Sequence, residues 1–166
     1  MATIALSTLG TADTGTPSGF SSVGKIQVRS VDIDLADAIT EKGSALAQGD
    51  VIEALVVPAE TLVLGGGIKV LSAMTGTSTD ATIDVGITGG TVDAFVDGFD
   101  LDAAAANATS FANPMEIQYV SANDTIDIKI VTQTGTITGG VIRVIGIFAE
   151  VGDEIAKRPG RAALGS

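Results

Sequence analysis

Apolar and polar residues alternate along several segments of the chain. The clearest examples are residues 81–87 (ATIDVGI) and 124–131 (DTIDIKIV), where isoleucine or valine occupies almost every second position. Successive side chains of a β-strand point to opposite faces, so this period of two predicts strands with one buried and one solvated face. In the first segment we expect Ile83, Val85 and Ile87 to face the core.

Residues 25–35 (KIQVRSVDIDL) also alternate, but the phase of the pattern changes at Ser30. Ile26 and Val28 fall on one parity, whereas the apolar residues after Ser30 fall on the other. If every apolar side chain faces the core, the strand must contain a bulge or a bend near this position.

Three further segments are expected to form strands. Residues 51–57 form an apolar run that ends at Pro58, which cannot donate a hydrogen bond to a sheet and so marks a strand end. Residues 115–120 (MEIQYV) are expected to pair with the DTIDIKIV strand as a hairpin, through the turn SAND at 121–124. The segment 141–151 (VIRVIGIFAEV) is apolar on both faces, which predicts a central strand.

Glycine-rich stretches separate the remaining segments. Gly65–Gly67 lies between the short apolar runs 62–64 and 68–74, and we interpret it as a turn, because glycine adopts the positive φ angles of turns without strain. Residues 36–50 contain two glycines and are predicted to form a loop with one helical turn. The Thr- and Gly-rich residues 132–140 are also predicted to form a loop.

Many short strands, frequent turns and no long helix predict an all-β domain with antiparallel pairing. The long connection at residues 88–113 favours the Greek-key crossovers of a jelly-roll β-sandwich, and a barrel is the alternative. We divide the chain into an extended N-terminal arm (1–24), a β-sandwich domain (25–151) and a short basic C-terminal tail (152–166).

The charge of the chain restricts its partners. Twenty acidic and nine basic residues give a formal net charge of −11, which disfavours binding to nucleic acid and to anionic membranes. We expect no transmembrane helix and no signal peptide, because no apolar run is long enough and the N-terminus lacks a basic region. The absence of cysteine indicates production in a cytoplasm.

Catalytic chemistry has few candidates in this sequence. Histidine and cysteine are both absent, which excludes the usual zinc sites and the usual Ser–His and Cys–His nucleophiles. No G-x-x-x-x-G-K-[ST] phosphate loop occurs, and nothing selects a pair of carboxylates for glycoside hydrolysis. We therefore expect no catalytic, cofactor-binding or metal-binding residues and no enzyme activity.

Residues 86–106 nevertheless gather four aspartates between two apolar segments. These are Asp93, Asp97, Asp100 and Asp102. An EF-hand loop that starts at the first of them fails, because its twelfth position is Ala104 rather than a carboxylate. A looser Ca²⁺ site made by the last three stays open as an alternative. The favoured interpretation is a loop that Phe95 and Phe99 hold against the sandwich while the aspartates face water.

The run from residue 56 to 105 (VVPAETLVLGGGIKVL to GFDLDAAA), closed by MEIQYV, DTIDIKIV and VIRVIGIFAEV, resembles the small virion proteins that decorate or cement the capsids of tailed phages. The resemblance covers about residues 25–151. It implies a jelly-roll-like sandwich without catalytic residues, made in the host cytoplasm and placed on the capsid exterior. It also implies two partners: the major capsid protein, whose neighbouring subunits it would bridge, and further copies of itself in a homotrimer.

We predict that Phe20 in the arm and Lys157, Arg158 and Arg161 in the tail contact the capsid or a sister subunit. A solvated, mobile tail is the alternative for the three basic residues. Other functions remain open, namely a head-fibre or tail-associated virion domain, a carbohydrate-binding β-sandwich module and a Ca²⁺-dependent adhesive or enzyme domain. The absence of Trp and the single Tyr disfavour the carbohydrate module, because aromatic side chains normally stack on sugars.

Overall fold

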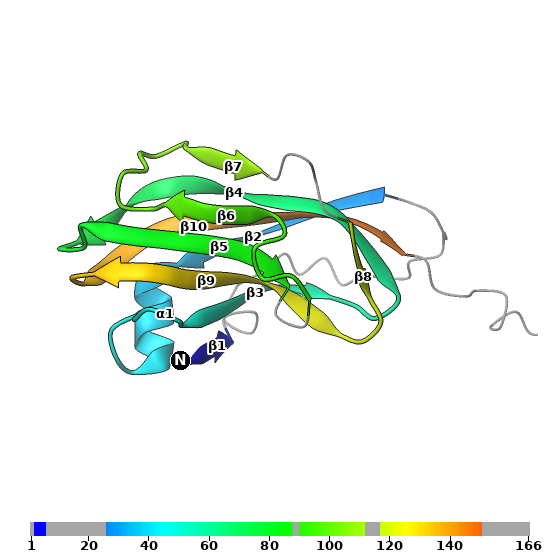
Figure 1. Ribbon diagram of the computed structural model, residues 1–166, viewed down its shortest axis with the longest axis horizontal. Coiled ribbons are helices and arrows are strands. Elements are labelled where there is room, and N and C mark those ends of the chain that lie inside the picture. Colours follow the sequence, from blue (N-terminus) through cyan, green and yellow to red (C-terminus); the bar gives the residue numbers. More distant parts are fainter. Residues whose placement is uncertain (1, 6–25, 88–89, 112–116, 151–166) are drawn as a thin grey trace, which may run out of the picture.

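The computed structural model describes residues 2–5, 26–87, 90–111 and 117–150, whose strands form two packed sheets (Figure 1). Sheet 1 has the strand order β1-β3-β9-β5-β6, and sheet 2 has the order β2-β10-β4-β7, with β8 also paired to β4. The elements are β1 (Thr3–Ala5), β2 (Ile26–Asp34), α1 (Leu35–Lys42), β3 (Val51–Val57), β4 (Thr61–Gly76), β5 (Asp80–Ile87), β6 (Val96–Asp100), β7 (Thr109–Phe111), β8 (Gln118–Val120), β9 (Asp124–Thr134) and β10 (Ile137–Glu150).

The strand order is that of a jelly roll. With β1 and β8 set aside, the other strands numbered in chain order give the sheets 1-8-3-6 and 2-7-4-5, which is the double-sheet arrangement built from two Greek keys. Apart from the parallel pair of β1 and β3, the pairings between described strands are antiparallel. The prediction of an all-β, jelly-roll sandwich is therefore confirmed.

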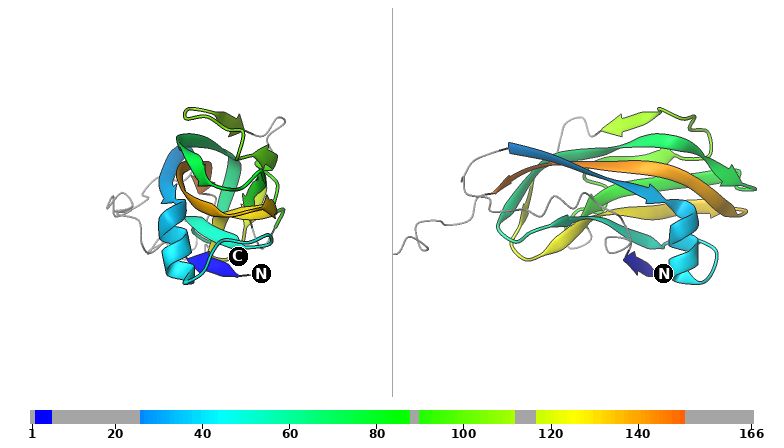
Figure 2. Two further views of the ribbon diagram at one scale, coloured as in Figure 1. Left: turned by 90° about the vertical axis from the view of Figure 1, so that its left-hand side faces the viewer. Right: turned by 180° about the vertical axis from the view of Figure 1, so that it is seen from behind.

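The hydrophobic core lies between the two sheets, which face each other in the end-on view of Figure 2. It consists mainly of Ile and Val from alternate strand positions, and each such side chain stabilises the fold by about 1.5–3 kcal/mol when fully buried. As predicted, Ile83, Val85 and Ile87 face this core. The most buried members include Ile33, Ile52, Val63, Ile68, Val85, Phe95, Ile126, Ile128 and Val144.

The bulge predicted near Ser30 is wrong. β2 pairs with β10 from Ile26 to Asp34 without any shift of register. Val31 is buried, whereas Val28, on the opposite parity, is 68% exposed. Arg29, which shares the parity of Val31, donates to the carbonyl of Val56 in β3 at 3.2 Å. The strand is regular, so its early apolar residues point away from the core.

The turn predicted at Gly65–Gly67 is also wrong, because β4 continues through these glycines as one strand of 16 residues. A Cβ atom at Gly66 would lie 3.0 Å from the ring of Phe95, and one at Gly67 would lie 2.2 Å from the ring of Phe111. The glycines therefore make room for aromatic rings that pack on the strand.

The loop predicted at residues 36–50 contains a two-turn helix, α1. Asp34 caps its N-terminus, since the side chain accepts a hydrogen bond from the Ala36 N–H. Gly43 ends it with a φ of 71°, and its N–H donates to the carbonyls of Ile39 and Thr40. These caps and the buried Leu35 hold a helix that propensity alone would not specify.

Two predicted connections differ from the structure. β8 pairs with β4 and not with β9, so the predicted hairpin is wrong and residues 121–123 cross from sheet 2 to sheet 1. The predicted loop at 132–140 is largely strand, because β9 ends at Thr134 and β10 begins at Ile137. Gly135, with a φ of 88°, makes the tight turn between them.

Part of the predicted N-terminal arm belongs to the sandwich. Thr3–Ala5 forms β1 and pairs with β3, so these residues of the predicted arm belong to sheet 1. The rest of the arm, and the predicted tail 152–166, lie outside the described residues, and the domain boundaries stay predictions. β2 begins and β10 ends at the same end of the molecule, opposite α1 (Figure 1).

Candidate assembly interface

The aspartate-rich segment is built into the sandwich as β6 and the turns beside it. Phe95 is fully buried in the core and Phe99 packs against it, which confirms the role predicted for these two rings. Asp102 accepts a hydrogen bond from the Ala81 N–H at 2.6 Å, so it fixes the start of β5. Within the described residues, no group of three or more acidic side chains is arranged to hold a metal ion.

A different surface, the outer face of sheet 2, stands out by its residue types. Directly paired residues of antiparallel strands place their side chains on the same face, so the register defines rows across the sheet. From β2 towards β7 or β8 these rows are Ile26–Ala149–Leu62–Tyr119, Val28–Ile147–Gly65, Ser30–Ile145–Gly67–Phe111 and Asp32–Arg143–Lys69.

The first three rows contain no charged side chain. Ile26 and Val28 are 66% and 68% exposed, and Phe111 and Tyr119 are 48% and 54% exposed. The other large apolar residues of these rows, Leu62, Ile145 and Ile147, are half-buried. We call this surface the apolar patch and define it as Ile26, Val28, Leu62, Phe111, Tyr119, Ile145 and Ile147. A contiguous exposed apolar surface of this kind is typical of a protein–protein contact.

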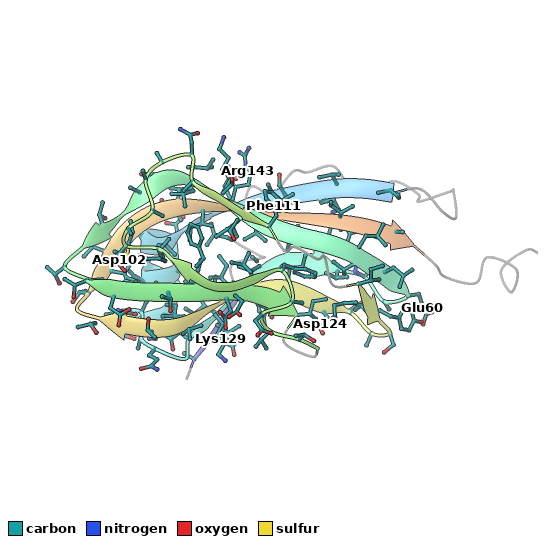
Figure 3. All side chains as sticks on the ribbon, turned by 45° about the horizontal axis from the view of Figure 1, so that its top comes forward. Glu60, Asp102, Phe111, Asp124, Lys129 and Arg143 are labelled. Carbon is teal, nitrogen blue, oxygen red and sulfur yellow. The ribbon has the colours of Figure 1, made fainter. Side chains whose placement is uncertain are left out.

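The fourth row marks a sharp change to charged side chains. Arg143 binds Asp32 through two parallel hydrogen bonds, from Nε at 2.6 Å and from Nη2 at 2.8 Å. The hydrogen bond from Arg143 lowers the pKa of Asp32, although partial burial opposes this shift. Figure 3 shows Arg143 and Phe111 on the same side of the molecule, one at the charged end and one in the apolar part.

Tyr119 gives the apolar patch a polar border at the opposite end. Its hydroxyl donates to Glu60 Oε2 at 2.6 Å, and this hydrogen bond raises the pKa of Tyr119. Glu60 adopts a left-handed conformation with a φ of 60°, in the turn between β3 and β4. The phenol group is thus satisfied within the chain, and the ring remains free to contact a partner.

The outer face of sheet 1 is of the opposite character. Its rows place Glu53 beside Asp127 and Lys129 beside Asp84. Asp127 accepts from the Thr125 hydroxyl at 2.6 Å, and Asp84 accepts from the Gly98 N–H at 2.8 Å. Lys129 lies on the side of the molecule away from Arg143 (Figure 3). The polar groups of this face are mostly engaged inside the chain.

The side chains on the outer face of sheet 2 are suited to contact with a partner rather than to a reaction. The apolar patch offers side chains that gain free energy by leaving water, at roughly 25 cal/mol per Å². At its borders, Asp32 is paired with Arg143 and Tyr119 with Glu60. Such a surface can bind another flat surface, and it offers no convergent polar groups to orient a small substrate.

Comparison with known proteins places the fold among chains of phage capsids. A chain in the capsid of Ralstonia phage GP4 superposes with a TM-score of 0.58 and 20% identity, covering 80% of this chain and 89% of that one. A chain in the capsid asymmetric unit of cyanophage Pam1 gives a TM-score of 0.57 and 16% identity, covering 79% and 89%. No protein-family model and no curated protein sequence matches the chain.

These TM-scores establish a shared fold. The shares covered are similar on both sides, so the two capsid chains are close in length to this one.

None of the described helices is long and apolar enough to cross a membrane.

The site residues predicted from sequence are not among those that form the apolar patch. Phe20, Lys157, Arg158 and Arg161 all lie outside the described residues. The apolar patch itself was missed, although its signal was present in the phase change at Ser30. The phase change marks apolar residues on both faces of a regular strand and not the predicted bulge.

Proposed function

We propose that this chain is a structural protein of a tailed-phage virion that binds the outer surface of the capsid and cements neighbouring major-capsid subunits. The observation that carries this proposal is the jelly-roll fold, shared over most of both chains with components of two phage capsids. The resemblance of residues 25–151 to decoration proteins supports the same role.

The surface of the chain is consistent with a role in binding. One sheet face is apolar and exposed, and the described residues contain no metal-binding cluster. A protein that binds only the assembled lattice stabilises it by mass action, because dissociation of the shell then requires loss of the bound protein. Contacts to two or more subunits add through avidity, so each contact can be weak.

The terminal segments are proposed as further contacts. Lys157, Arg158 and Arg161 place three of the nine basic residues within five positions of an acidic chain, which suits an acidic surface on the capsid or on a sister subunit. Phe20 would supply an apolar anchor in the arm. We propose a homotrimer as the form that binds, without nucleic acid or membrane as a partner.

Counting copies tests the role directly. Quantitative mass spectrometry of purified virions of the phage that encodes this chain should find it in hundreds of copies, in a fixed ratio to the major capsid protein. A handful of copies would point instead to a tail or head-fibre part. Particles lacking the chain should then release their DNA at a lower temperature, and added purified chain should restore the original value.

The tail contacts are tested by replacing Lys157, Arg158 and Arg161 with Gln. We expect weaker binding to capsids that lack the chain, and a smaller dependence of the remaining binding on salt. The melting temperature of the free chain is the folding control. Unchanged capsid occupancy would remove these residues from the interface. Deletion of residues 1–22 is a poorer test, because it also removes β1 from sheet 1.

A further inference from the structure

We propose that the apolar patch is the contact between copies of this chain, so that copies associate through the outer faces of their second sheets before they meet a capsid. The inference deepens the proposed function, since it assigns one surface to one partner. Three observations carry it: the distribution of charge, the charged border of the apolar patch, and the edge of β2, which no described strand other than β10 pairs with.

The charge of the chain favours this surface for self-association. Two copies, each with a formal net charge of −11, repel one another wherever acidic surfaces approach. In its paired rows, the outer face of sheet 1 carries three acids (Glu53, Asp84 and Asp127) against one lysine, Lys129. The first three rows of sheet 2 carry no charge, so copies can approach there with the least repulsion and the largest gain from apolar burial.

The charged border of the apolar patch suits a second copy as well. Asp32 and Arg143 present a carboxylate and a guanidinium side by side, and their side chains are 45% and 41% exposed. A border that carries both signs can place the carboxylate of one copy beside the guanidinium of the next copy around a three-fold axis, whereas a row of one sign could not. The same pair would give the contact a defined orientation.

The edge of sheet 2 supplies the third observation. β2 is an edge strand of nine residues that contains no proline and shows no shift of register. The outer strands β1 and β7 have only three residues each. Natural proteins normally shorten, bend or charge an exposed edge to prevent aggregation. The charged residues of β2 all follow Val28, so the start of this edge, at exposed Ile26 and Val28, is its uncharged part, and another copy can cover it.

Replacement of Val28 by Asp tests this contact, and Val56→Asp is the matched control. Both valines are exposed strand residues, at 68% and 43%, but Val56 lies in β3 of sheet 1. By analytical ultracentrifugation the wild-type chain and the Val56→Asp variant should be stable oligomers at micromolar concentration. Val28→Asp should weaken association by about 30-fold or more, as expected for a buried hot spot. A monomeric wild type would overturn the inference.

Cysteine labelling checks the contact without introducing a charge. The natural chain has no cysteine, so Val28→Cys and Val56→Cys each create a single thiol. Maleimide should react more slowly at position 28 than at position 56 in concentrated solution, and the difference should disappear on dilution below the dissociation constant. A ratio of the two rates that does not change with concentration would contradict the proposal.

Binding to capsids that lack the chain separates this inference from the proposed function. If Val28→Asp is monomeric and still occupies capsids at higher protein concentration, both ideas stand. If the wild type is already monomeric and Val28→Asp loses capsid binding, the apolar patch faces the capsid, so the inference fails while the function stands. If the oligomer forms through the patch but no capsid binds it, the inference stands and the function fails.

Discussion

The two outer faces of this sandwich differ in the side chains that they expose. On sheet 1, the chain itself satisfies the polar groups: Asp84 and Asp102 accept backbone hydrogen bonds from Gly98 and Ala81. On sheet 2, the chain leaves exposed apolar rows that end at one ion pair. The jelly-roll fold thus determines which residues form the core, whereas the outward-facing residues of each strand can differ and can form contacts with a partner.

Asp50 connects several elements at the β1 end of sheet 1 through its hydrogen bonds. This buried carboxylate, which precedes β3, accepts hydrogen bonds from the Ala2 N–H at 2.9 Å and the Ala47 N–H at 2.8 Å, and it pairs with Lys42. One side chain thus joins β1, α1 and the loop that follows the helix. On the outer face of sheet 2, the Asp32–Arg143 pair joins only two neighbouring strands, β2 and β10.

The largest expected effect is therefore at Asp50. Asp50→Asn should lower the free energy of unfolding by about 2–4 kcal/mol, because it removes the charged partner of Lys42 at a buried site. Urea unfolding at pH 7 measures the change. Asp93→Asn, at an exposed position, is the control with the same change in charge. A loss as small as that of the control would mean that Asp50 does not hold the N-terminal strand.

The pH dependence of stability gives a second readout of the same residue. Burial by itself would raise the pKa of Asp50, but the hydrogen bonds from Lys42, Ala47 and Ala2 outweigh it, and the folded-state pKa lies below its ordinary value of about 3.9. The carboxylate therefore contributes stability above about pH 4, and this contribution is lost as the pH falls through the folded-state pKa. The difference between the wild type and Asp50→Asn should shrink on acidification.

Substitution of one glycine on each outer face should also affect stability to different extents. A Cβ atom at Gly86 in β5 would lie 2.2 Å from the Thr91 carbonyl oxygen, whereas one at Gly67 in β4 would lie 2.2 Å from the ring of Phe111 and 2.5 Å from the Ser110 carbonyl oxygen, both in β7. We expect Gly86→Ala to cost about 2–3 kcal/mol and Gly67→Ala about 1 kcal/mol, because the three-residue β7 at the sheet edge can shift. Thermal unfolding should show the difference, and equal losses would contradict it.

Periodicity predicted the sandwich well and its surface poorly. The alternation in β5 and β9 specified buried faces correctly, since their isoleucines and valines form the core. The same rule failed for Ile26 and Val28, because an apolar side chain on a regular strand does not have to face inwards. Nothing in a single sequence distinguishes a contact surface from a core surface when both are built of Ile and Val.

Predictions of turns from short sequence motifs were wrong where contacts with distant residues determine the local structure. The glycines in β4 look like a turn until the rings of Phe95 and Phe111 are placed against them. The SAND segment looks like a hairpin turn, yet β8 finds its partner in β4, more than fifty residues earlier in the chain. Long-range pairing of this kind is set by the whole topology and leaves no local trace.

Val28 and Val31, which lie on opposite parities of β2, test the regular register of that strand. Val31→Thr should cost about 1–2 kcal/mol, because it buries a hydroxyl in the core, whereas Val28→Thr should change the stability of the monomer by less than about 0.5 kcal/mol. Chemical unfolding at concentrations below self-association isolates this effect. A bulged β2 would reverse the order or make the two losses equal.

The smallest expected effect is at the ion pair of sheet 2. The pKa of Asp32 is lowered mainly by the hydrogen bond from Arg143, but both side chains are more than a third exposed, so water and salt screen the pair. Asp32→Asn should leave the melting temperature almost unchanged at physiological salt and lower it slightly at low salt, where the Debye length is about 30 Å.

The same variant has a further use as a probe of association. If the pair orients two copies, Asp32→Asn should slow their association at low salt while hardly changing the stability of the monomer. Stopped-flow mixing of dilute chains measures this rate, and Asp93→Asn again supplies the charge control. An association rate equal to that of the control would show that only the apolar rows guide the contact, and that the ion pair merely ends them.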